Sequence, residues 1–130
     1  MAEGDQARSE VDQFILAYID SVPHLESLLL LWNSGASWSA KDLAARLYVD
    51  QNQATKILQD LARDDLVTSL PEAPQLFRYK SKNPEQDQLM QAVTLAYSRE
   101  LVRVSSLIHS KASPAIREFA RAFRFTKEKK

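Results

Sequence analysis

Apolar residues between positions 39 and 67 recur at a spacing that predicts two short helices, a tight turn between them and a strand after them. Ser39, with Asp42 three residues later, has the pattern of a capping box, and Asp50 is an N-cap residue for the next helix. The inward residues are Leu43, Ala44 and Leu47 in the first helix, and Ala54, Ile57, Leu58 and Leu61 in the second. The turn lies at Leu47, Tyr48 and Val49. This layout predicts a helix-turn-helix over about residues 39–64.

Two short strand patterns follow the helix-turn-helix. They cover residues 66–70 and 76–80, and the residues between them include two prolines. The sequence therefore predicts a small two-stranded β-hairpin, or wing, over residues 66–80.

The remaining segments have helical patterns. One helix is expected over about residues 10–20 and a second from Pro23 to about Trp32. Residues 84–110 contain no Gly and no Pro after Pro84, which predicts one unbroken helix of about 26 residues. A final helix is expected to begin at Ser113, so that the C-terminal helices cover about residues 84–124. The predicted fold class is mainly α, a winged helix-turn-helix with helices on both flanks.

Composition narrows the class of protein. The 130 residues, 45% apolar and 26% charged, suit one domain over residues 1–130. There is no cysteine, and His24 and His109 have no partners at metal-ligand spacing, so both are expected to pack or to cap helices. No set of side chains indicates an enzyme, a metal site or a cofactor. The longest apolar run, residues 28–32, is too short for a membrane span, and the first ten residues do not resemble a targeting peptide, so we expect a cytoplasmic protein with no membrane role.

Charge is distributed unevenly although the formal net charge is zero. Residues 1–98 contain 8 basic and 14 acidic residues, whereas residues 99–130 contain 9 basic and 3 acidic ones. The basic segment 99–130 suits a solvated helix face and tail, or a surface that holds phosphates or an acidic partner.

The order of helices, helix-turn-helix, wing and terminal helices resembles the MarR-like group of bacterial winged-helix transcriptional regulators. The resemblance covers nearly the whole chain. Its core consists of the apolar and cap positions Leu43, Ala44, Leu47, Val49, Asp50, Ala54, Leu58, Leu61, Leu66 and Val67. Asp65 stands where such regulators usually place a Gly to end the helix in a left-handed conformation.

This resemblance implies a transcriptional regulator that binds double-stranded DNA as a homodimer. The second helix of the motif would enter the major groove and the wing would contact the backbone. Gln and Asn pair well with adenine, so Gln51 and Asn52 are the expected specificity residues. The full set of expected DNA contacts is Gln51, Asn52, Gln53, Thr55, Lys56, Arg78 and Lys80.

The same resemblance implies that the terminal helices form the dimer interface. The apolar residues expected there are Phe14, Tyr18, Val93, Tyr97, Val104, Ile116 and Phe119. It also implies an effector pocket, for which Trp32, Trp38, Phe77 and Tyr79 are candidate lining residues, although packing in the core is the more usual role of such aromatics.

A second hypothesis is that the chain is a winged-helix module that binds a protein partner and has little or no affinity for DNA. From residue 36 to residue 80 there are six basic and six acidic residues, and the tip of the wing carries Glu72. Such a neutral segment attracts the DNA backbone only weakly.

Overall fold

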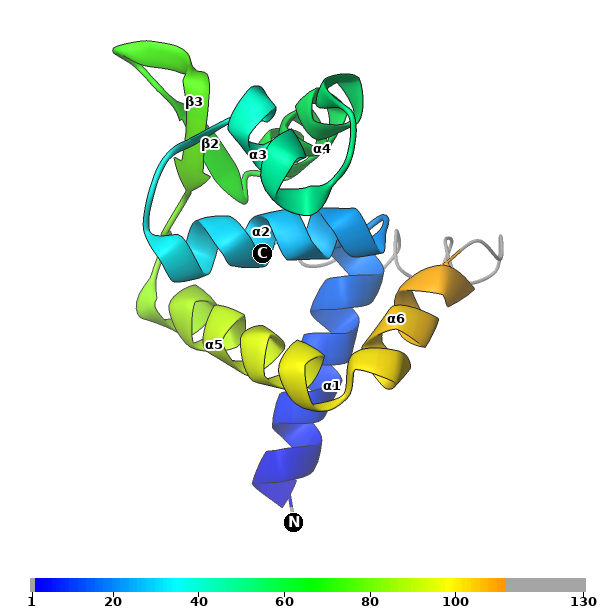
Figure 1. Ribbon diagram of the computed structural model, residues 1–130. Helices are drawn as coiled ribbons and strands as arrows, with labels where there is room; N and C mark the ends of the chain where they lie inside the picture. Colours follow the sequence, from blue (N-terminus) through cyan, green and yellow to red (C-terminus); the bar gives the residue numbers. More distant parts are fainter. Residues whose placement is uncertain (1, 112–130) are drawn as a thin grey trace. The chain divides into compact units, whose positions relative to one another are not determined.

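The computed structural model describes residues 2–111, and of residues 2–7 it describes the backbone only. Its elements in chain order are α1 (Ala2–Tyr18), α2 (Val22–Ser34), β1 (Trp38–Ser39), α3 (Ala40–Leu47), α4 (Gln51–Arg63), β2 (Val67–Leu70), β3 (Ala73–Tyr79), α5 (Pro84–Arg99) and α6 (Leu101–Ser110) (Figure 1). The protein is therefore mainly helical with one small sheet, as predicted. The helix predicted from Ser113 lies outside the described residues.

The chain separates into two compact units. One contains residues 23–84, and the other combines residues 2–22 with the described residues from 85 onward. The helix-turn-helix pattern and the strands lie in the first unit, and α1, α5 and α6 lie in the second. The single domain expected over residues 1–130 stays a prediction.

Local sequence explains why α3 and α4 begin where they do. The Ser39 hydroxyl accepts a hydrogen bond from the Asp42 backbone N–H at 3.1 Å, and the Asp50 carboxylate accepts one from the Gln53 N–H at 2.7 Å. Both bonds satisfy backbone donors that the first turn of a helix leaves free. The two predicted N-caps are thus confirmed.

The turn between α3 and α4 contains a residue in the left-handed region. Tyr48 has φ 59° and ψ 42° and donates its backbone N–H to the Ala44 carbonyl, which ends α3. Glycine usually occupies such a position because a Cβ atom there is strained. The predicted inward residues are buried, Leu43, Ile57 and Leu58 among them, except Leu47, which is half-buried.

The sheet has three antiparallel strands in the order β1, β3, β2. The predicted wing accounts for β2 and β3, but β1, in which Trp38 pairs with Phe77, was missed because two residues give no periodic signal. The prediction that the second strand starts at Leu76 was wrong. It starts at Ala73, which pairs with Leu70, and Pro74 is tolerated in the strand because it lies in the irregular part of the pairing between Ala73 and Phe77.

The unbroken helix predicted over residues 84–110 was also wrong. It is divided into α5 and α6 at Glu100, whose φ of −129° and ψ of 50° are not helical. The Glu100 carboxylate accepts hydrogen bonds from Arg8 of α1 at 2.8 Å and from Arg103 at 3.2 Å. The break is accompanied by contacts between distant residues, which no Gly or Pro in the sequence announces.

Arg103 and Lys111 attach α6 to α1. Arg103 Nη1 contacts both carboxylate oxygens of Asp12, at 2.9 and 3.0 Å. The buried Lys111 donates to the backbone carbonyls of Ile15 and Ile19, at 3.3 and 2.6 Å. Ile15 lies in the last turn of α1 and Ile19 directly follows the helix, and the Ile15 carbonyl also accepts the Ile19 N–H at 3.0 Å. Lys111 is thus bound to the C-terminal end of α1, where backbone acceptors are only partly satisfied within the helix.

Across residues 2–111, no single helix has both the length and the apolar character needed to cross a membrane.

Candidate nucleic-acid interface

The outward face of α4 carries the amide side chains that the sequence singles out. Gln51, Asn52 and Gln53 are exposed in its first turn, and Lys56 is exposed one turn later. Thr55 is half-buried, and its hydroxyl donates to the Gln51 carbonyl at 2.9 Å. The opposite face of α4 is buried, so the helix is strongly amphipathic and its polar face is not needed for packing.

Tyr48 lies next to this face, although the sequence analysis did not include it among the expected DNA contacts. Its side chain is 95% exposed, although a large aromatic side chain in a folded protein usually loses most of its exposed surface. It precedes the N-cap Asp50 by two residues, so it lies beside the start of α4. Its place in the turn was visible in the sequence, but its exposure follows only from the tertiary structure.

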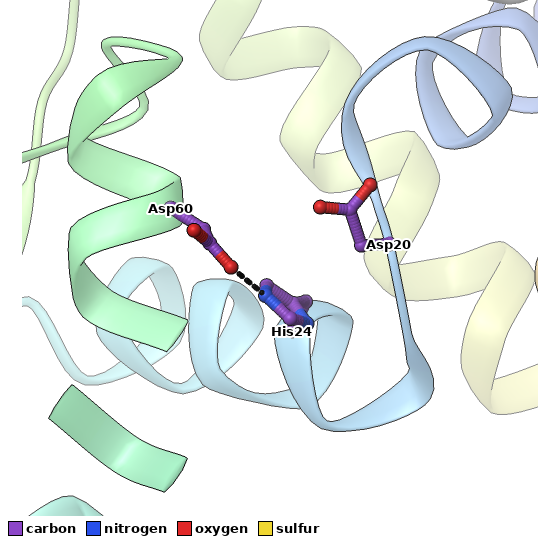
Figure 2. A group of neighbouring side chains, drawn as sticks. All are labelled: Asp20, His24 and Asp60. Atoms are coloured by element: carbon purple, nitrogen blue, oxygen red, sulfur yellow. Dashed lines mark hydrogen bonds and ion pairs between the residues drawn. The ribbon is translucent and has the colours of Figure 1, made fainter. Parts of the chain in front are cut away.

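The buried carboxylate of Asp60 on α4 contacts side chains from α2 and from α4 itself. Its Oδ2 lies 2.9 Å from Nε2 of His24 on α2, and Figure 2 shows the two side chains directed at each other. Lys56 Nζ lies 3.3 Å from both oxygens, and Arg63 Nη1 lies 3.2 Å from Oδ1. His24 thus packs in the unit, as the sequence predicted, but its pairing with Asp60 was not foreseen because 36 residues separate them.

The charge of Asp60 is stabilised by these neighbours. Burial acts to raise the pKa of Asp60, but the hydrogen bonds from His24 and Lys56 and the charge of Lys56 outweigh it, so the pKa lies below its ordinary value. Asp60 is therefore an anion near neutral pH. The two cations of α4, Lys56 and Arg63, both lie against it, so the helix presents little net positive charge.

The cations of the hairpin differ from one another. Arg78 is exposed, and no ion pair joins it to any residue that the structure describes. Lys80 Nζ lies 2.7 Å from the Asp65 carboxylate, and Lys82 Nζ lies 3.4 Å from it. The hydrogen bond from Lys80 lowers the pKa of Asp65. Asp65 has φ 64°, which confirms that the position after α4 has the left-handed backbone conformation.

The four aromatic candidates for an effector pocket form two pairs. The rings of Trp32 and Tyr79 meet edge to face with centroids 5.0 Å apart. Both line a cavity of about 430 Å³ together with Arg78 and Lys80. Trp38 and Phe77 instead face each other as partners in the β1–β3 register and are not among the lining residues.

The residues expected at a dimer interface have unequal exposure. Phe14, Val93 and Val104 are buried in the single chain, while Tyr18 and Tyr97 are half-buried. Ile116 and Phe119 lie outside the described residues. The dimer interface stays a prediction. Of its described members, only the two tyrosines have exposed surface that a second copy of the chain could contact.

Comparison with models of known families, with characterised proteins and with solved structures gave no match to this chain.

Proposed function

We propose that this protein is a DNA-binding winged-helix transcriptional regulator, of MarR-like type, that acts as a homodimer. The observation that carries the proposal is the exposed first turn of α4, with three amide side chains and a capped start, on a helix whose other face is buried. A helix that presents polar side chains from its N-terminal turn is the usual reader of the major groove.

Base recognition in this proposal depends on Gln51 and Asn52. Each carries a donor and an acceptor on one planar group, which matches the N6 and N7 edge of adenine. Gln53, Thr55 and Lys56 are available for neighbouring bases or phosphates. Tyr48, because of its exposure next to this turn, is an additional candidate for a phosphate or sugar contact.

In this proposal the hairpin and α3 contact the phosphate backbone of the DNA. Arg78 is free to meet a phosphate, and Lys80 can do so by giving up its bond to Asp65. Lys41 and Arg46 of α3 are exposed and join no ion pair within the described residues. Few cations are available in total, so we expect binding with a shallow dependence on salt.

The test is selection from random-sequence DNA by the purified full chain at two salt concentrations, with its mass measured by light scattering. A dimer that enriches an inverted repeat supports the proposal. The double variant Gln51→Ala, Asn52→Ala should lose about 1–3 kcal/mol of discrimination for each base contact removed. The matched control is Gln88→Ala, Gln91→Ala, which removes two exposed amides from α5.

Two results would contradict the proposal. One is the absence of any enriched sequence with a folded protein. The other is an equal loss of discrimination in the control, because that would show that amides outside α4 matter as much.

A second function, a winged-helix module that binds a protein partner, is favoured by the charge arrangement. Lys56 and Arg63 lie against Asp60, and Lys80 lies against Asp65, so the cations that could hold a phosphate backbone are already near carboxylates. If selection enriches no DNA, this function becomes the leading one, and the exposed α4 face is its expected contact surface.

A further inference from the structure

A groove in the unit formed by α1, α5 and α6 has the features of a ligand site that is separate from the α4 face. It has a volume of about 380 Å³, within the usual range for small-molecule sites. Its apolar lining comes from Val11 of α1 and from Ala92, Leu95 and Ala96 of α5. Leu95 is 49% exposed, so it offers apolar surface to a ligand in the groove.

Three arginines and one glutamate line the same groove. Arg8 comes from α1, Arg99 from the end of α5 and Arg103 from α6, and Glu100 lies at the break between α5 and α6. The hydrogen bond from Arg103 lowers the pKa of Glu100, which is therefore ionised at neutral pH. The lining thus carries an excess of positive charge beside an apolar surface.

Two of the guanidinium groups have unused capacity for hydrogen bonds. Arg103 uses Nη1 for Asp12 and Nε for Glu100, but its Nη2 is buried and has no acceptor within the described part of the chain. Arg99 is exposed and forms no ion pair within residues 2–111. A buried donor without an acceptor is rare and costs free energy, so a ligand oxygen that reached Arg103 would be stabilised there.

From these observations we infer that the groove binds a small amphipathic carboxylate, with its charged group among Arg8, Arg99 and Arg103 and its aliphatic tail on Val11, Ala92, Leu95 and Ala96. Arginine suits this ligand class because its planar fork matches the two oxygens of a carboxylate. The tail is held by removal of apolar surface from water, to which both the ligand and Leu95 contribute. This inference does not depend on the proposed DNA binding.

The first experiment is titration of the full-length protein with octanoate, followed by isothermal titration calorimetry. Octan-1-ol, which has the tail without the charge, and acetate, which has the charge without the tail, are the matched ligands. Saturable binding of octanoate that is at least tenfold tighter than that of either control supports the site. Absence of octanoate binding, or equal binding of octan-1-ol, overturns it.

Variants then test the location. Arg99→Gln should weaken octanoate binding by roughly tenfold, since it removes one charge-assisted contact. Its control is Arg46→Gln, an exposed arginine in the other unit. Leu95→Asn should also weaken binding, whereas Val102→Asn, at a residue that is 77% exposed and does not line the groove, should not. Unchanged affinity in both Arg99→Gln and Leu95→Asn overturns the assignment.

Discussion

His24 Nε2 on α2 lies 2.9 Å from Asp60 Oδ2 on α4, and both side chains are almost completely buried. This pair joins the helix that carries the exposed amides to a helix 36 residues earlier in the chain. Asp60 also meets Lys56 and Arg63, so one carboxylate both fixes the inner edge of α4 and offsets its positive charge.

The pair gives a prediction on stability. Asp60→Asn should lower the free energy of unfolding by about 1–3 kcal/mol at pH 7, because His24 loses a charged acceptor in a buried position. Urea denaturation followed by circular dichroism measures the change. Glu72→Gln, at the exposed hairpin tip, is the control and should change stability very little. Equal stability of the two variants would exclude a structural role for the pair.

The same pair gives a prediction on pH. The pKa of folded Asp60 lies below its ordinary value of 3.8. A carboxyl group with a lowered pKa contributes stability above the pKa that it has in the unfolded chain, and this contribution disappears as the pH falls through the folded pKa. The stability difference between the natural protein and Asp60→Asn should therefore be level near neutral pH and should shrink below about pH 4. A difference that grows on acidification would contradict this assignment.

Tyr48 is expected to lower the free energy of unfolding, because a non-glycine residue occupies a left-handed position beside the exposed face of α4. Because its φ is 59° and its side chain is 95% exposed, Tyr48→Gly should relieve backbone strain without loss of packing. We expect a gain of about 0.5–1 kcal/mol in urea denaturation. Tyr48→Ala, which keeps the Cβ atom, should leave stability unchanged. If Tyr48 contacts DNA, both variants will also weaken binding, and Tyr48→Phe separates the ring from the hydroxyl.

Lys111 is expected to hold α6 against the end of α1. Lys111→Met keeps the length of the side chain but removes the donor to the Ile15 and Ile19 carbonyls, so it should cost about 1–3 kcal/mol. The exposed neighbour His109, changed to Met, is the control. Thermal unfolding of the two variants is the measurement, and equal melting temperatures would contradict the predicted role of Lys111.

Leu58 tests the core of the helix pair α3 and α4. Its side chain is fully buried, so Leu58→Ala should cost roughly 2–5 kcal/mol in urea denaturation, whatever the function of the protein. Gln59→Ala, at the next position but exposed, should have almost no effect. A small effect of Leu58→Ala would mean that α4 is packed differently.

Local signals in the sequence were sufficient for much of the unit at residues 23–84. Ser39 and Asp50 mark the helix starts because an N-cap bond joins residues only three apart. The buried face of α4 follows from helical periodicity, which also leaves Gln51 and Asn52 outside. The left-handed position at Asp65 was expected from the resemblance to winged-helix regulators, which usually have Gly there, and not from a local signal.

Tertiary structure decided what depends on residues far apart in the chain. The break at Glu100 has no local breaker and coincides with bonds to Arg8, 92 residues away, and Arg103. The pairing of Trp38 with Phe77, the contact of His24 with Asp60 and the groove near Arg99 likewise join distant segments. Periodicity and capping are short-range effects, so the sequence by itself determined where α3 and α4 begin and which of their faces is buried. The charge pairs and cavities were decided by packing, which brings together side chains that no local pattern connects.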